Sequence, residues 1–296
     1  MKKILGIVVL GLLMSANVYA APKFSAKVGD IVENEVSFGK YDKFPLPPGE
    51  FTVSVIKRSK EFRDVMLYQI DEKTGTVRWE INIYATGRGE GWWNAPDFCK
   101  RTNIYFIKKK IGNKKFACWM VNHTRTDIGA NKGFWKEVRD YRLSNKLIVP
   151  NIMVYSHYEY AKNSKLYGVQ YYYNPELDGV PKPKNLEWDT NEFNINKVMN
   201  YPKHEEFLKK YISISANLVD RFNQLNKVKG GLTLNPEENF TQASINVEKA
   251  GTKKVKKSTD ANKGDIVSQI KGLKELLDAG AITQDEFDKA KKKLLN

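Results

Sequence analysis

The last part of the chain, residues 264–296, contains two short amphipathic helical patterns joined by a turn. From Ile266 onward, apolar residues recur at spacings of three and four, which places them along one side of a helix. Gly280 follows this stripe, where glycine readily takes the left-handed conformation that ends a helix. Thr283 and Glu286 form a capping box that opens the second helix. A unit this small cannot bury its own apolar sides, so we expect it to pack on another surface.

The same segment contains the runs Asp278-Ala279-Gly280, Ile282-Thr283 and Glu286-Phe287. In these residues and in its leucine spacing it resembles the SHOCT domain, a short helical hairpin at the C-terminus of many otherwise unrelated bacterial proteins. The resemblance implies self-association or docking to another envelope protein, and it brings no catalytic residue. The alternative is a hairpin that folds back onto its own body. The residues expected to contact a partner are Leu273, Leu276, Leu277, Ile282, Phe287, Leu294 and Leu295.

The beginning of the chain has the order of segments found in a signal peptide. Lys2 and Lys3 precede an apolar run over Ile4–Met14, and small residues lead to Ala20. This order predicts cleavage near Ala20 and a periplasmic or secreted protein, whereas a retained amphipathic membrane anchor is the alternative. No later segment reaches the apolar length of a membrane-spanning helix, so we expect no transmembrane segment in the mature chain.

The chain is strongly basic, with a formal net charge of +15. Such an excess of positive charge suggests nucleic acid as a partner, but export argues against it. Lysine rather than arginine also supplies most of the positive charge. Two interpretations remain, a compositional bias toward lysine or attraction to anionic envelope material.

Cys99 and Cys118 are the two cysteines of the chain. In an exported protein this pair predicts one disulfide, and closing a loop of about 20 residues would contribute roughly 3 kcal/mol. The functional alternatives are weaker, because a cysteine nucleophile needs a histidine nearby and two cysteines supply half of a zinc site.

The pattern predicts an α+β protein with a strand-rich antiparallel body and a long closing helix. The predicted divisions are a signal peptide over 1–20, the body over 21–226, a flexible basic linker over 227–263 and the helical hairpin over 264–296. Alternation of apolar and polar residues predicts strands at 51–55, 65–70, 77–85, 104–109, 116–121, 152–160 and 166–173, with hairpins at 65–85 and 104–121. Helical spacing predicts helices at 131–143 and 205–225.

Two parts of the body are candidate ligand sites. A glycine-rich run over 87–91 leads into an aromatic pair that could stack on a sugar or a cation, although such rings also serve as core. The tip of the second hairpin is basic, which predicts either an anion-binding finger or a solvated turn that discourages edge pairing. The residues of these two candidates are Trp92 and Trp93, and Lys108, Lys109, Lys110, Lys114 and Lys115.

No catalytic or metal motif is present in the sequence. The histidines are His123, His157 and His204, and none belongs to a His-Glu-x-x-His pattern. We therefore expect a non-enzymatic protein without cofactor or metal, whose C-terminal hairpin mediates oligomerisation or docking. The alternative is a module that binds an anionic or glycan ligand through the body, and an enzyme with an unrecognised site is a third.

The body also contains the runs Leu46–Glu50 and Trp119–His123. In them it resembles uncharacterised exported bacterial proteins, from which no function follows.

Overall fold

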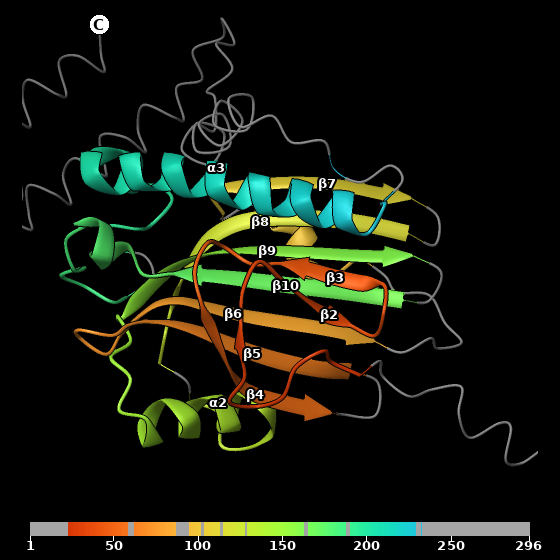
Figure 1. The fold of residues 1–296 in the computed structure, drawn as a ribbon. Coiled ribbons are helices and arrows are strands. Elements are labelled where there is room, and N and C mark those ends of the chain that lie inside the picture. Colours follow the sequence, from red (N-terminus) through yellow and green to blue (C-terminus); the bar gives the residue numbers. More distant parts are fainter. Residues whose placement is uncertain are drawn as a thin grey trace, which may run out of the picture. The chain divides into compact units, whose positions relative to one another are not determined.

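The computed structural model describes residues 23–58, 62–86, 95–101, 104–112, 115–127, 129–162, 165–187, 190–228 and 232. Within these ranges, eight strands form one antiparallel sheet in the order β1-β4-β5-β6-β10-β9-β8-β7, and β2 pairs separately with β3 (Figure 1). The strands are β1 (Ile31–Val32), β2 (Glu35–Phe38), β3 (Asp42–Pro45), β4 (Phe51–Arg58), β5 (Phe62–Asp71), β6 (Thr76–Thr86), β7 (Phe106–Gly112), β8 (Lys115–Arg125), β9 (Ile152–Lys162) and β10 (Lys165–Tyr173). The helices are α2 (Gly133–Ser144) and α3 (Pro202–Leu225), with short 3-10 turns η1 (Asp97–Lys100), η2 (Pro175–Asp178) and η3 (Val198–Asn200).

The strand-rich antiparallel body predicted from the sequence is confirmed. Both predicted hairpins form, as β5 with β6 and as β7 with β8. The two further strands predicted before the long helix are β9 and β10, which also pair with each other. The predicted C-terminal hairpin lies outside the described residues.

Helix α3 lies along one face of the sheet, which we call the helix face (Figure 1). Alternation in β6 turns Trp79, Ile81 and Ile83 to this side, where they are buried in the main core with the apolar residues of α3. The Trp119 indole donates a hydrogen bond over 2.7 Å from Nε1 to Ser215 Oγ on α3. The helix face is therefore closed by aromatic packing in which the buried indole N–H of Trp119 is paired.

The end of α3 is joined to the small β2–β3 sheet. The Asn226 side chain accepts a hydrogen bond from the Lys43 backbone N–H over 2.9 Å and donates one to the Lys43 carbonyl over 2.6 Å. Leu232 is buried against the same core, and its carbonyl accepts a hydrogen bond from Asn223 over 3.2 Å. Part of the segment expected to be linker thus contacts the body.

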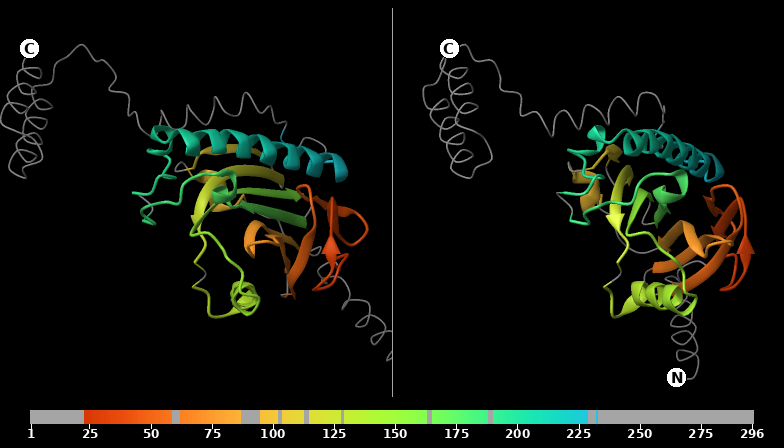
Figure 2. Two further views of the ribbon diagram at one scale, coloured as in Figure 1. Left: turned by 60° about the vertical axis from the view of Figure 1, so that its left-hand side comes forward. Right: turned by 90° about the vertical axis from the view of Figure 1, so that its left-hand side faces the viewer.

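Helix α2 packs on the opposite face, which we call the second face, near β4 and β5 (Figure 2). A buried ion pair holds it there, since the Arg142 guanidinium binds the Glu80 carboxylate and donates over 2.9 Å to the Tyr68 hydroxyl. α2 covers only one end of the second face. The middle of that face, between α2 and η1, carries the polar side chains considered next.

Candidate functional site

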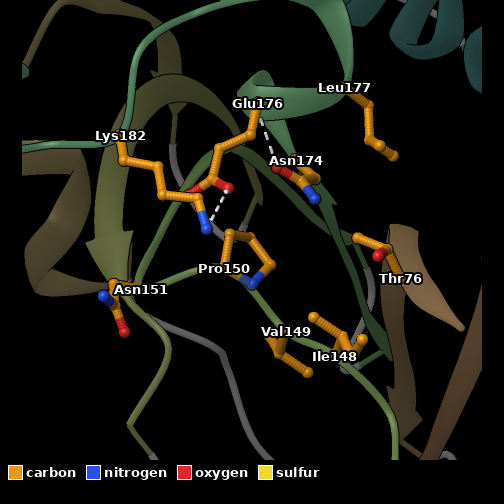
Figure 3. Close-up of a pocket in the computed structure, with 9 residues that line it drawn as sticks. All are labelled: Thr76, Ile148, Val149, Pro150, Asn151, Asn174, Glu176, Leu177 and Lys182. Carbon is orange, nitrogen blue, oxygen red and sulfur yellow. Dashed lines mark hydrogen bonds and ion pairs between the residues drawn. The ribbon is translucent and has the colours of Figure 1, made fainter. Parts of the chain in front are cut away.

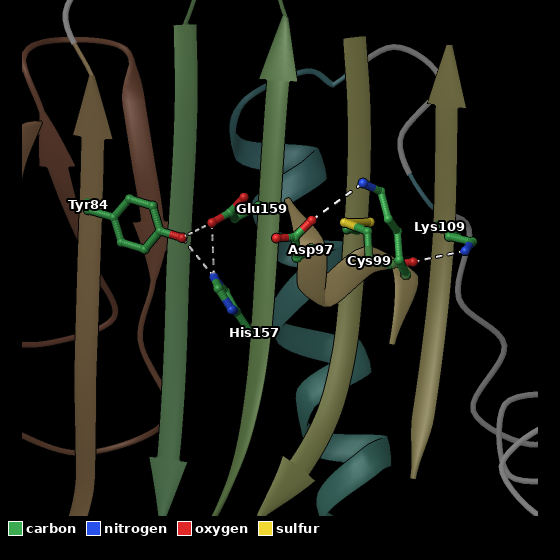
Figure 4. The surroundings of a disulfide bond; sticks show 8 residues. Tyr84, Asp97, Cys99, Lys109, His157 and Glu159 are labelled. Atoms are coloured by element: carbon green, nitrogen blue, oxygen red, sulfur yellow. Dashed lines mark hydrogen bonds and ion pairs between the residues drawn. A yellow bond between two sulfur atoms is a disulfide. The ribbon is translucent and has the colours of Figure 1, made fainter. Parts of the chain in front are cut away.

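A disulfide between Cys99 and Cys118 joins η1 to β8, which confirms the predicted pairing (Figure 4). Both cysteines are fully buried in an apolar cluster that includes Phe98 and Met120. Lys109 donates a hydrogen bond from Nζ to the Cys99 carbonyl over 2.9 Å. The disulfide therefore fixes η1 against the second face of the sheet.

Beside η1, the strand register aligns one row of side chains across the second face. Tyr84 on β6 is paired with Gly168 on β10, and Gly168 is paired with Glu159 on β9. The Tyr84 ring crosses β10 at this glycine, because a Cβ atom at residue 168 would overlap the ring. The absence of a side chain on Gly168 thus lets the Tyr84 hydroxyl reach β9.

The Tyr84 hydroxyl meets two side chains of β9 (Figure 4). It donates a hydrogen bond to Glu159 Oε1 and lies 2.7 Å from His157 Nε2. Because a hydroxyl has one hydrogen, His157 Nε2 must carry the proton and donate to the Tyr84 oxygen. In the neutral imidazole His157 Nδ1 is then an acceptor, and Gln170 Nε2 lies 3.4 Å from it.

This polar cluster, which consists of Tyr84, His157, Glu159 and Gln170, is a chain of hydrogen bonds that all point the same way. The Tyr172 hydroxyl donates to Gln170 Oε1 over 2.8 Å and begins the chain. The Glu159 carboxylate is its terminal acceptor. Glu159 Oε1 also lies 3.3 Å from His157 Nε2, a contact that becomes an ion pair when the imidazole is protonated.

The chemistry of the cluster does not favour Tyr84 as a base or nucleophile. Burial raises the pKa of Tyr84 well above its ordinary value, and the Glu159 carboxylate raises it further. Tyr84 consequently stays protonated near neutral pH and acts as a donor to Glu159.

A second carboxylate lies in the same row. Asp64 on β5 is paired with Tyr84, on the side away from Glu159. Burial raises the pKa of Asp64 to about 6. Among the described residues Asp64 has neither a hydrogen bond nor an ion pair, so this half-buried acid stands without a partner.

Aromatic rings border the polar cluster on two sides. Phe98 of η1 stacks on His157 with ring centroids 4.1 Å apart. Tyr155 and Tyr172 stack on each other at 5.1 Å, and both are half-buried. The polar cluster therefore lies beside stacked aromatic rings.

The other two histidines lie in the helix-face core. The Tyr105 hydroxyl donates to the Phe193 carbonyl, so His123 Nδ1–H donates to the Tyr105 oxygen over 2.7 Å. Burial lowers the pKa of His123 to about 3, and it also lowers the pKa of His204. Both imidazoles are therefore neutral parts of the packed interior at neutral pH.

A cavity of about 320 Å³ lies at the opposite end of the strands (Figure 3). Glu176 and Lys182 face it and pair with each other at 3.5 Å. Its other walls are mainly apolar or amide side chains: Thr76, Ile148, Val149, Pro150, Asn151, Asn174 and Leu177. Because the two charges at this cavity neutralise each other, it offers less for a ligand than the polar cluster does.

The lysines predicted as an anion-binding finger are distributed over both faces of the sheet. Lys109 turns to the disulfide on the second face, whereas Lys108 lies on the helix face, where its charge acts on Asp220 of α3. Alternation places Lys110 on the helix face as well, and Lys115 is exposed at the start of β8. These cations do not gather on one surface.

Several predicted site residues lie outside the described part of the chain. They are the aromatic pair Trp92 and Trp93, Lys114 at the hairpin turn, and the seven apolar residues of the C-terminal hairpin. Their predicted roles in binding stay predictions.

Sequence analysis missed Asp64, Tyr84, Glu159 and Gln170. Two signals were available. Gly168 interrupts a strand pattern, which is typical of a close approach by another group. His157 and Glu159 are two residues apart in a strand, which places them on one face.

Within the described ranges, no group of three or more histidine, cysteine, aspartate or glutamate side chains could hold a metal ion. In the same part of the chain, no helix has the length and apolar character needed to cross a membrane.

Comparison with known families gives one finding. Residues 268–295 match the model of the short C-terminal domain, SHOCT. No curated protein and no solved structure matches the chain significantly. The resemblance stated from the sequence is thus confirmed, and the chain carries a SHOCT domain at residues 268–295.

Proposed function

We propose that this chain is an exported, non-enzymatic protein whose SHOCT domain mediates oligomerisation or docking to a cell-envelope partner. The observation that carries the proposal is the family match over residues 268–295, which coincides with the apolar stripe of Leu273, Leu276 and Leu277. Burial of these leucines against a second copy or an apolar groove would provide the driving force.

Export is supported by the disulfide and by the segment order at the beginning of the chain. Disulfides persist in oxidising compartments and are rare in the cytosol. The bond between Cys99 and Cys118 joins two buried cysteines, so it serves the packing of η1 and has no exposed thiol chemistry.

A non-enzymatic body is supported by the surroundings of its histidines. His123 is neutral and buried, and His157 uses both ring nitrogens in hydrogen bonds to neutral side chains. Among the described residues, neither lies beside a hydroxyl or thiol nucleophile of lowered pKa, which acyl-transfer sites require.

The first experiment is the solution mass of the mature protein beside a version that ends at Lys263, measured by light scattering over a concentration series. The truncation keeps Leu232, because that residue packs on the body. We expect the mature protein to be oligomeric and the truncated one monomeric.

A matched pair of variants locates the contact. Leu273→Ser with Leu277→Ser removes two residues of the apolar stripe, whereas Lys271→Ser with Lys274→Ser changes the polar side of the same helix. Only the leucine variant should lose the assembly. If the mature protein is monomeric, self-association is wrong. The docking alternative is then tested by a pull-down from an envelope extract. The mature protein should capture a partner protein, and the leucine variant should not.

A further inference from the structure

We propose that Arg58 and Arg63 bind a phosphate group on the helix face, where β4 ends and β5 begins. The phosphate belongs either to a lipid headgroup or to a soluble molecule. This site lies on the body and is independent of the role proposed for the SHOCT domain.

The first argument is the strand register, which places the two arginines side by side. Arg58, the last residue of β4, pairs directly with Arg63 of β5. The next pair on the same face, Ile56 with Val65, packs in the main core, so both arginine side chains leave the sheet on the helix face. Directly opposed residues have Cβ atoms about 5 Å apart, and like charges at such positions destabilise a sheet. An anion bound by both arginines would relieve this repulsion.

The second argument is the lack of a counter-charge. Among the described residues neither arginine forms an ion pair or a side-chain hydrogen bond, and Nε of Arg63 is buried without an acceptor. Burial and the charge of Arg58 lower the pKa of Arg63. The adjacent Asp64 does not compensate this charge, since it lies on the second face and burial is the one cause of its raised pKa. Arg142, by contrast, is neutralised by Glu80.

The chemistry of the pair selects a phosphate rather than a carboxylate. Each guanidinium presents its N–H donors in a flat fork, and the two oxygens of one carboxylate are engaged by a single fork. A phosphate has further oxygens for the second fork, so it can accept from both arginines at once. Arg58 is exposed and Arg63 is half-buried, which leaves the pair open to a ligand from solvent.

The surroundings of the pair also suit a surface that carries many phosphates. β4 and β7 end at the same edge of the sheet, at the right of Figure 1. Lys110 of β7 and Lys115 of β8 are exposed near this edge. The strand order places them four or five strands from β5, which is about 20–25 Å. A soluble phosphate therefore reaches only the arginines, whereas a layer of lipid headgroups would contact the lysines as well.

The test for a soluble phosphate is an NMR titration of the full mature chain with inorganic phosphate, with acetate as the control anion. We expect phosphate to shift the Nε–H signals of both arginines and acetate to leave them unchanged. Arg63→Gln, followed at Arg58, should weaken phosphate binding by about tenfold or more, since it removes charged hydrogen bonds. Arg125→Gln removes the same charge from an exposed residue at the opposite end of the strands, and it should bind as the wild type does.

The test for a lipid headgroup is co-sedimentation of the same chain with phosphatidylglycerol vesicles, with phosphatidylcholine vesicles as the neutral control. We expect binding to the anionic vesicles alone, and Arg63→Gln should weaken it more than Arg125→Gln does. Lys110→Gln with Lys115→Gln should weaken vesicle binding but not the binding of inorganic phosphate.

The two experiments separate the sources of the phosphate. A response to inorganic phosphate without vesicle binding indicates a soluble ligand, and arginine-dependent vesicle binding without that response indicates a headgroup. Equal effects of Arg63→Gln and Arg125→Gln in both experiments overturn the proposal, as do equal shifts with acetate. If Arg63→Gln does not fold, the wild type alone decides, because unchanged arginine signals at saturating phosphate together with no vesicle binding also overturn the proposal.

Discussion

Asp64→Asn should make this protein more stable at neutral and alkaline pH. Asp64 is half-buried between its register partners, Lys57, which is paired with Glu137, and Tyr84, whose hydroxyl points away to Glu159. Asparagine has the same shape and no charge. Because Asp64 has no hydrogen bond to described residues, the substitution removes the desolvated charge and no known contact.

The size of the effect follows from the titration of the carboxyl group. The pKa of Asp64 rises from its ordinary 3.8 to about 6 on folding because of burial. At roughly 1.4 kcal/mol per pKa unit, ionised Asp64 costs up to about 3 kcal/mol, and solvent screening of a half-buried group reduces this to about 1–2 kcal/mol. The folded state binds this proton more tightly than the unfolded state does. The stability of the wild type therefore falls as the pH rises from the unfolded pKa through the folded pKa.

The assay is urea unfolding of wild type and Asp64→Asn at about pH 8 and at about pH 3, where the carboxyl is neutral in both states. We expect a gain of about 1–2 kcal/mol at the higher pH and almost none at the lower one. Asp127→Asn controls for the general loss of a surface carboxylate. A variant that is less stable than the wild type at the higher pH, or equally stabilised at both, would refute the reasoning.

Three further substitutions test the packing around the site. Gly168→Ala should destabilise the protein by about 1–3 kcal/mol, because the new methyl overlaps the Tyr84 ring. In a Tyr84→Ala background the same change should cost less than about 1 kcal/mol, and additive urea-unfolding costs would contradict this. Arg142→Ala leaves Glu80 buried without its cation, so thermal melts should show a loss of about 3–5 kcal/mol that Glu80→Gln partly restores. Cys99→Ala opens a crosslink between residues 19 apart and should cost about 3 kcal/mol by chain entropy, whereas an unchanged urea midpoint would refute a structural role.

Local patterns were enough to predict most of the sheet's strands. Alternation over 77–85 predicts one buried face of β6, and the structure buries Trp79, Ile81, Ile83 and Ala85 on the helix face. Val77 instead packs on the second face, because the register of β5 and β6 shifts next to it. Helical spacing likewise predicted α3, which begins three residues before the predicted start, at Pro202. Proline is favoured in the first turn of a helix because the N–H groups of that turn have no acceptor within the helix, so the absence of an N–H in proline costs no hydrogen bond.

The order of the strands was beyond such patterns. β10 pairs with β6, although η1, β7, β8, α2 and β9 lie between them in the chain. Alternation determines which side chains share a face of one strand, but not which strand is its neighbour. The short β2 and β3 were missed as well, since each has only four residues.

The polar cluster depends on that long-range pairing. Tyr84 and Glu159 are 75 positions apart, and their hydrogen bond requires β10 to lie between them with a glycine at residue 168. Sequence reasoning drew attention to the histidines because imidazole is common in catalysis. In the structure Asp64 is the unusual group, because its charge has no partner among the described residues.

Two glutamates on the same face show what this difference means. Glu80 is paired with Arg142 and Tyr68, and that pairing holds α2 on the sheet. Glu159 instead accepts from the Tyr84 hydroxyl and lies 3.3 Å from His157 Nε2. Asp64, which is separated from it by β6 and β10, has no donor among the described residues. Packing alone does not require the charge of Asp64, since a neutral side chain at this position would avoid the cost of desolvation. Asp64→Asn therefore measures what this unpaired charge costs the folded protein.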